Sequence, residues 1–189
     1  MNKTYKSARQ KILDVASELF YNEGIRAVGV DKIVEVSGVS KGTLYRHFPS
    51  KDDLIIAYLE EQNESSWVLF EDAISVYEGA PRMQILAIVE SVKTSLTEPR
   101  NRGCVFLNAQ AEFSSEHPIQ NLVQERIHKL RNLLQRLTKE AGATDDTLAD
   151  QLLLLINGAL STAPIMGADI AGEQLKKASV SLIDLHLNQ

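Results

Sequence analysis

The segment Val34–Leu54, VEVSGVSKGTLYRHFPSKDDL, gathers side chains that bind phosphate oxygens. Lysine, threonine, tyrosine, arginine and histidine all occur between positions 41 and 47, and each donates hydrogen bonds to phosphates or to the edges of bases. Glycines, serines and a proline interrupt the same segment, so it is either a solvated connector or a surface that meets a partner. The helices around it decide between these two interpretations.

The residues before this segment predict two helices. Ser7-Ala-Arg-Gln10 fits a capping box that begins the first helix, and Gly24 is a natural end for it. Between these points apolar residues recur at helical spacing. Ile33 and Val36 then indicate a short second helix that ends before Gly38.

Two further helices are predicted within and after the segment. Ser40 is placed to cap a third helix over 41–48, which ends before Pro49 because proline disfavours helical geometry in the residue that precedes it. Ser50 is placed to cap a fourth helix over 51–77, with two aspartates in its first turn, where the helix dipole favours negative charge. At about 1.5 Å per residue, this fourth helix reaches roughly 40 Å and would tie a small head to a larger body.

The third helix separates into an inward and an outward face. At about 100° per residue, Leu44 and Phe48 lie on one side and face the core with Val39. The outward, flanking and border positions are occupied by Gly42, Arg46, Thr43, Tyr45, Lys41 and His47. A short helix, a tight glycine turn and a second short helix form the layout of a helix-turn-helix, whose second helix enters the major groove of DNA.

The remainder of the chain is also predicted to be helical. Helical patterns cover about 82–97, 103–114, 119–141, 145–166 and 170–187. Asn157-Gly158 alone would indicate a hairpin, but its flanks have a helical period. No stretch alternates as a strand does, so the predicted fold is all-α, with a three-helix head over 1–50 and a body of about six helices over 51–189.

Composition and charge predict a soluble cytoplasmic protein with a basic head. Residues 1–51 hold nine Lys/Arg and five Asp/Glu, a net charge of +4, which leaves −9 on the rest of a chain whose net charge is −5. The single cysteine, Cys104, excludes an internal disulfide and suits a reducing compartment. The N-terminal residues lack a secretory signal. The most apolar region contains breakers such as Pro164 and falls short of the roughly 20 apolar residues that a membrane span needs.

The motif resembles that of a known family. The span from Leu19 through Gly24, Ile33 and SGVSKGTLYRHFPSKDDL is similar to the DNA-binding domain of the TetR family of one-component transcriptional regulators, and RGCVFLNAQAEF (Arg102–Phe113) is similar to a stretch in some of its branches. Gly29 stands where the family commonly has a threonine that meets a phosphate, so the Gly29 N–H or Lys32 is expected to replace that contact.

The resemblance implies which residues contact DNA. Lys41, Thr43, Tyr45 and His47 match positions that touch DNA in the family, with Tyr45, His47 and Lys51 chiefly on phosphates. Together with the outward face of the third helix, the predicted DNA-contact residues are Lys32, Lys41, Gly42, Thr43, Tyr45, Arg46, His47 and Lys51.

The resemblance also implies a regulatory body and a homodimer. Family members pair through their last two helices, and here the eighth helix, apolar on nearly all sides, needs burial from both directions. A pseudo-palindromic operator would then meet two recognition helices. A small, largely apolar or aromatic effector is expected to release the repressor by shifting its conformational population. Its candidate contacts are Trp67, Phe70, Tyr77, Cys104, Phe106, Asn108, Gln110, Phe113 and Met166.

Several alternatives stay open. Cys104 could sense electrophiles or oxidants if Arg100 and Arg102 lie near it and favour the thiolate. The dimer could instead answer to a protein partner or to concentration. A helical enzyme or metal-binding bundle is a further alternative, because Glu125-x-x-His128 has the spacing of di-metal helix bundles. Those bundles need the pattern twice, so the prediction is of no metal, no cofactor and no catalysis. The basic residues Lys3, Lys6, Arg9 and Lys11 form either a phosphate-tracking arm or a solvated terminus.

Overall fold

The computed structural model describes residues 6–97 and 102–187. These residues form nine helices and no strand, which confirms the all-α prediction. The helices are α1 (Ala8–Glu23), α2 (Val30–Ser37), α3 (Lys41–His47), α4 (Lys51–Ser75), α5 (Pro81–Leu96), α6 (Val105–Glu112), α7 (Ile119–Glu140), α8 (Thr147–Met166) and α9 (Ala168–Leu187).

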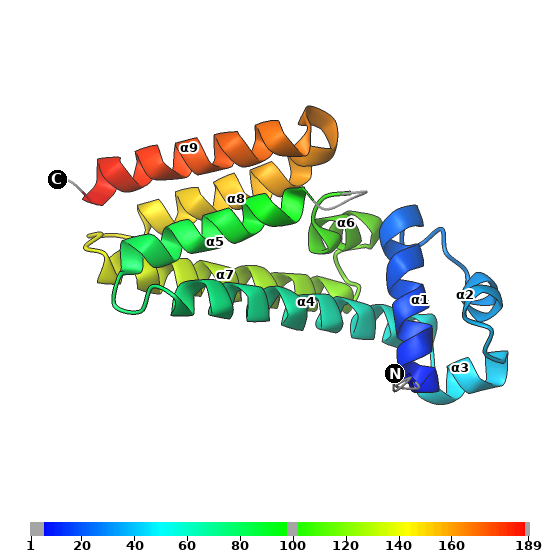
Figure 1. The fold of residues 1–189 in the computed structure, drawn as a ribbon. Helices are drawn as coiled ribbons and strands as arrows, with labels where there is room; N and C mark the ends of the chain where they lie inside the picture. The colour runs from blue at the N-terminus through cyan, green and yellow to red at the C-terminus, as the bar shows by residue number, and fades with distance from the viewer. Residues whose placement is uncertain (1–5, 98–101, 188–189) are drawn as a thin grey trace, which may run out of the picture.

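The helices divide into a small group at one end and a long bundle (Figure 1). Helices α1, α2 and α3 lie together at one end, and α4 runs from α3 along the length of the bundle. In the bundle, α5 packs on α4, α7 and α9, and α8 packs between α7 and α9. The short helix α6 lies between α1 and the bundle, in contact with α4 and α7.

Three serine caps fix where the N-terminal helices begin, as predicted. The Ser40 and Ser50 hydroxyls accept hydrogen bonds from the third residue of α3 and α4, and Ser50 forms a full capping box with Asp53. Ser7 likewise accepts from the Gln10 N–H at 3.2 Å. The predicted box at Ser7 is only half formed, because the Gln10 side chain donates to Asp14 and to Glu61 on α4 instead.

Two clusters of buried side chains hold the fold together. The first joins α1–α3 and the first half of α4 to α6 and to the start of α7, where Phe106 and Ile119 are fully enclosed. The second joins the rest of α4 to α5, α7, α8 and α9. The hydrophobic contacts of the head therefore continue into α6, and the boundary at residue 50 stays a prediction.

The second helix faces the core differently from its predicted face. Ile33 is fully buried as expected, but Val36 is 56% exposed and Ser37 is buried in its place. The Ser37 hydroxyl donates to the Val34 carbonyl, so its polar atom is satisfied inside the core. An apolar side chain is thus left on the outer surface beside the turn to α3.

Candidate DNA interface and ligand cavity

The turn between α2 and α3 has the conformation that a helix-turn-helix needs. Gly38 adopts φ 65° and ψ 20°, a left-handed geometry that glycine takes without steric cost, and its N–H closes α2 on the Val34 carbonyl. Leu44 and Phe48 are buried against α1, as predicted. The opposite side of α3 is open, with Tyr45 42% exposed and Arg46 exposed beside it.

Two of the predicted DNA-contact lysines form ion pairs on the surface. Lys41 Nζ lies 2.6 Å from Asp31 Oδ1, and this hydrogen bond raises the pKa of the lysine. Lys32 Nζ lies 2.5 Å from Glu23 Oε2. Both pairs are solvent-exposed, so a phosphate group would compete with the carboxylate for each ammonium. Thr43 Oγ1 lies 2.9 Å from Ser40 Oγ within the helix cap.

Lys51 lies in a different environment from the other predicted DNA contacts. Its ammonium donates a 2.7 Å hydrogen bond to the Ile25 carbonyl and lies 5.9 Å from the centre of the Phe20 ring. Burial there lowers the pKa of Lys51. The side chain therefore points into the junction between α1 and α4, and a phosphate contact would require it to leave this carbonyl.

The basic N-terminal residues are partly engaged with the head. Lys6 Nζ lies 2.5 Å from Asp14 Oδ2, and the Arg9 guanidinium lies 5.1 Å from the centre of the Phe48 ring. Lys11 is exposed close to the turn at Gly38. Lys3 lies outside the described residues, as does Arg100.

A large cavity lies where α1, α4, α5, α6, α7 and α8 meet. Its volume is about 560 Å³, which is within the range of small-molecule sites. Of the predicted ligand contacts, Phe70, Cys104 and Phe106 line this cavity. Gly103 brings the start of α6 against α8, because its φ is 84° and a Cβ atom there would lie 2.8 Å from the Leu160 carbonyl oxygen. A side chain at this position would push Cys104 away from the cavity wall.

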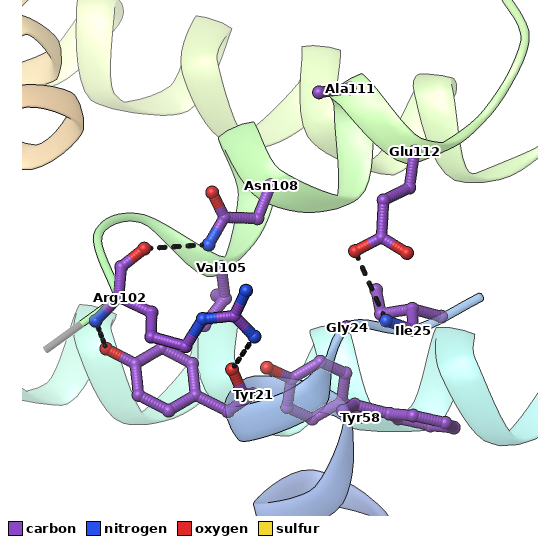
Figure 2. Close-up of a pocket in the computed structure, with 10 residues that line it drawn as sticks. Tyr21, Gly24, Ile25, Tyr58, Arg102, Val105, Asn108, Ala111 and Glu112 are labelled. Carbon is purple, nitrogen blue, oxygen red and sulfur yellow. Dashed lines mark hydrogen bonds between the residues drawn. The ribbon is translucent and has the colours of Figure 1, made fainter. Parts of the chain in front are cut away.

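A smaller cavity of about 220 Å³ adjoins the first and opens between α1 and α6 (Figure 2). Asn108, another predicted ligand contact, lines it, and its amide donates to the Arg102 carbonyl at 3.0 Å. Tyr21, Tyr58 and Val105 line both cavities. The two hollows therefore share one wall at the base of the head.

Five predicted ligand contacts line neither cavity. Trp67 is buried against Phe70 and donates to Asn63, while Phe113 stacks on His117 at 4.4 Å. The other three are exposed: Tyr77 lies in the turn after α4, Gln110 lies on the outer side of α6, and Met166 lies at the end of α8. Their aromatic, amide or thioether side chains suggested ligand contacts, but none of the five lines either cavity.

Sequence reasoning missed the polar wall of the large cavity. Arg126 from α7 and Tyr58 from α4 line it, together with a row of serines. The serines are Ser17, Ser65, Ser66, Ser91 and Ser95. Ser91 and Ser95 lie one helical turn apart, as do Gln62 and Ser66. This spacing is a weak signal that each pair of polar side chains lies on one face of its helix.

Two sets of hydrogen bonds join α6 to the end of α1 (Figure 2). The Glu112 carboxylate accepts from the backbone N–H of Ile25 at 3.2 Å, as Figure 2 shows, and from the backbone N–H of Arg26 at 2.7 Å. At the other end of α6, Arg102 donates its backbone N–H to the Tyr21 hydroxyl at 2.8 Å and its guanidinium to the Tyr21 carbonyl at 2.9 Å. The helix that lines the cavity is thus fastened at both ends to the head.

These features define a helix-turn-helix DNA-binding protein with a helical regulatory body. The family model described as bacterial regulatory proteins, tetR family, matches residues 12–58. The chain is 24% identical over 163 residues to the transcriptional regulator AcrR of Shigella flexneri, covering 82% of this chain and 76% of that protein. It is 33% identical over 128 residues to the regulator QacR of Staphylococcus aureus, covering 66% of this chain and 63% of QacR.

The solved structures agree over nearly the whole length. SCO4454, a TetR-family transcriptional regulator from Streptomyces coelicolor, superposes with a TM-score of 0.91 at 29% identity, covering 95% of each chain. The chain belongs to the TetR family of bacterial transcriptional regulators, as the motif predicted. The relatives are named as regulators and not as enzymes.

The structure bears on two expectations from the sequence, the interruption of the apolar eighth helix and the absence of a metal site. The predicted breakers do not interrupt α8, which continues through Pro164, so by length and composition alone it meets the criterion for a membrane span. Within the protein, 39% of the most apolar 18-residue stretch of α8 is buried. Glu125 and His128 are exposed on α7, and no group of three potential metal ligands converges within residues 6–97 and 102–187.

Proposed function

We propose that this chain is a cytoplasmic homodimeric repressor that leaves its operator when a small, largely apolar molecule occupies the large cavity. The observation that carries the proposal is the double role of α6. Its first turn contributes Cys104, Val105 and Phe106 to the cavity wall, and its last residue, Glu112, holds the head through two backbone N–H groups. A ligand that displaces α6 would therefore displace the head.

The ligand would act by favouring one of two arrangements of the head. A ligand shifts a conformational equilibrium only by its difference in affinity for the two states. In the described arrangement, α6 and the residues just before it make the contacts of Arg102 and Glu112 with the head, and Tyr58 of α4 lines both cavities. Ligand binding that moves α6 or α4 would change the separation of the two recognition helices in the dimer, so that they no longer match their half-sites.

The apolar surface of α8 and α9 supports dimerisation through these helices. Leu154 in α8 is 71% exposed and Ile165 near its end is 85% exposed. Met166, Ile170 and Leu185 continue this exposed surface. Large apolar side chains exposed on two neighbouring helices are typical of an interaction site, and a second copy of the same two helices would cover them. Burial from this side also accounts for the hydropathy of α8 without a membrane.

The DNA contacts are proposed on the open side of the helix-turn-helix. Gly42, Tyr45 and Arg46 face outward from α3, with Lys41, Thr43 and His47 beside them, and Lys32 lies on α2. The basic head would attract the phosphate backbone while the acidic body repels it, which orients the head toward DNA. Lys51 would join these contacts only after its bond to Ile25 breaks.

A titration with DNA tests the proposal. Fluorescence anisotropy with the promoter region of the chain's own gene should show specific binding that weakens steeply as salt rises, because phosphate contacts release counterions. Tyr45→Ala and Arg46→Ala should each abolish or strongly weaken this binding. Arg136→Ala is the matched control, because it removes an exposed cation from α7, remote from the head. Unchanged binding in both head variants would refute the recognition-helix assignment.

Ligand screening by thermal shift distinguishes a small-molecule effector from control by a protein partner or by concentration. A true effector binds the folded state and raises its stability by mass action, and it should release the protein from DNA in the same titration. A compound that raises stability without releasing DNA would contradict the proposed mechanism.

Cys104 supports a second candidate function, the sensing of electrophiles. Its thiol is half-buried in the cavity wall and lies close enough to Arg126 for the two to interact electrostatically. Arg102, which the sequence placed near the thiol, directs its guanidinium to the Tyr21 carbonyl instead. Alkylation of Cys104 no faster than that of a free-thiol peptide would exclude this function.

A further inference from the structure

Arg126 lines the large cavity, and its guanidinium forms no ion pair with residues 6–97 or 102–187. It extends from α7, and its Nη1 donates a 2.9 Å hydrogen bond to Asn63 Oδ1. The same Asn63 oxygen also accepts from Trp67 Nε1 at 3.0 Å. The guanidinium carbon lies 4.4 Å from the centre of the Phe106 ring, so the charged group stacks on an aromatic face in the wall. One of its five N–H donors is occupied by this arrangement.

No carboxylate balances this charge among the described residues. No Asp or Glu within residues 6–97 and 102–187 forms an ion pair with Arg126, whereas Arg131 one turn later pairs with Asp150 at 2.6 Å. Glu18 is the acidic residue in the cavity wall, and it is exposed and makes no such pair. Burial lowers the pKa of Arg126, yet an arginine keeps its charge at physiological pH. A partly buried cation without a counter-charge is costly, and an anion bound in the cavity would offset that cost.

Two other hydrogen-bond donors in the same wall also lack a partner. Tyr58 is 2% exposed, and its hydroxyl makes no hydrogen bond within the described part of the chain. Ser17 Oγ is buried without a partner there. Cys104 lines the same wall as these groups. Each of these groups can donate a hydrogen bond, and Arg126 can only donate, so a ligand with acceptor oxygens would satisfy all three.

The rest of the wall suits an apolar ligand body. Phe70, Phe106, Leu69, Val92 and Leu160 line the same hollow. A volume of about 560 Å³ admits a molecule larger than a simple inorganic ion. A single guanidinium matches one negative charge in bidentate geometry, whereas a phosphate dianion would need a further cation.

We infer that the effector is a small organic monocarboxylate with an aromatic or aliphatic body, and that its carboxylate binds Arg126. This inference rests on the proposed function and narrows it to one chemical class. The carboxylate would lie against the Arg126 guanidinium near the start of α6, and the apolar body would fill the space toward Phe70 and Leu160. Tyr58 or Ser17 would donate to a second acceptor on ligands that carry one.

Matched pairs of probes test the inference on the full-length dimer. 2-Naphthoate is compared with 2-naphthamide, and decanoate with decanamide, because each pair differs in charge at nearly constant shape. Calorimetric titration should show at least one acid binding about 10- to 100-fold more tightly than its amide, as expected for the loss of a charge-assisted hydrogen-bond pair. The same acid should release the protein from DNA.

Three variants assign the preference to Arg126. Arg126→Met keeps an unbranched chain over Phe106 without the charge, and it should reduce the preference for acid over amide to about twofold or less. Arg126→Lys keeps the charge but loses the planar fork, so an intermediate preference is expected. Lys129→Met is the control: Lys129 lies on the same helix over the Trp67 ring at 4.1 Å, outside the cavity wall, and its loss should leave the preference unchanged.

The outcomes separate this inference from the proposed function. Equal binding of acid and amide, a preference that survives in Arg126→Met, or no binding of either acid at about 1 mM would overturn the carboxylate assignment. Release from DNA by a neutral compound would then still support a ligand-responsive repressor. Absence of specific DNA binding, or of release by any ligand, would instead refute the proposed function. If Arg126→Met does not fold, Arg126→Gln replaces it, because glutamine removes the charge and keeps an N–H donor for the Asn63 oxygen; a preference for the acid that survives in Arg126→Gln would overturn the carboxylate assignment.

Discussion

The contact between Glu112 and the head offers a direct test of how α6 is fastened. Replacing Glu112 by glutamine keeps the size of the side chain but leaves one acceptor oxygen for two backbone donors. The Ile25 and Arg26 N–H groups then compete for that oxygen, and the new amide turns its own N–H toward a donor. We therefore expect Glu112→Gln to loosen the turn between α1 and α2 without disturbing the core of the body.

The expected loss of stability in Glu112→Gln follows from these two hydrogen bonds. A hydrogen bond to a charged group contributes about 1.5–3 kcal/mol when it is well protected. Ile25 is buried but Arg26 is exposed, so solvent weakens the second bond and we expect a total loss of about 1–2 kcal/mol. In a chain of this size each kcal/mol lowers the melting temperature by about 2–4 °C.

Hydrogen exchange locates the effect. Peptides that cover residues 24–28 should lose protection in Glu112→Gln, whereas peptides from α8 should exchange as in the wild type. Glu116→Gln is the matched control, because Glu116 is exposed in the loop after α6 and forms no ion pair or hydrogen bond within the described residues. If Glu112→Gln and Glu116→Gln have the same melting temperature and the same exchange at residues 24–28, the proposed fastening is wrong.

Three further predictions concern charge, assembly and pH. Asp31→Asn should tighten DNA binding by about two- to fivefold in an anisotropy titration, because it releases Lys41 and removes a negative charge beside α3. Leu154→Glu should convert the proposed dimer into a monomer in sedimentation equilibrium, because it puts a charge among the exposed apolar side chains of α8. Hydrogen bonds from Arg131 hold the pKa of Asp150 below its ordinary value, so this pair stabilises the protein above about pH 4 and loses that effect as pH falls through the folded-state pKa. Chemical denaturation at acidic pH should therefore show a shallower loss of stability in Asp150→Asn than in the wild type.

The head was predicted well because its signals are local in sequence. Ser40 and Ser50 bond to N–H groups three residues away, and Gly38 supplies a backbone conformation that few other residues adopt. Such features depend on near neighbours and need no knowledge of the tertiary fold. The second hydrogen bond of the predicted capping box at Ser7 does not form, because the Gln10 side chain donates to Glu61 on α4 instead. Glu61 lies 51 positions away in sequence, so local patterns could not predict this contact.

The cavity was predicted poorly because its wall is assembled from distant segments. Phe70 and Phe106 were found because aromatic side chains are expected in an apolar lining. Tyr77 and Met166 are also large side chains with apolar surface, but they lie at the ends of α4 and α8 and are exposed. Periodicity assigns a side chain to a face of its own helix and does not say which helix will cover that face.

Arg126 illustrates the same limit for charge. In sequence it belongs to QERIHKLRNLLQR, a stretch whose many charged residues are typical of a solvated helix face. Arg131 and Arg136 fit that interpretation, since they pair with Asp150 and Glu140 on the surface. Arg126 does not, because Phe106 and Asn63 enclose its guanidinium from two other helices.

The position of Arg126 also gives α6 a clear mechanical role. This helix has eight residues and is therefore about 12 Å long, too short to bend appreciably between its ends. A ligand held by Arg126 would press on Phe106 in the first turn, while Glu112 holds the head at the last. A tilt produced at one end of so short a helix would be passed to the other, while the buried Phe106 and Ala109 keep the helix attached to the core. The direction of that tilt, and with it the spacing of the recognition helices, would depend on how far the ligand body extends from Arg126 toward Phe70.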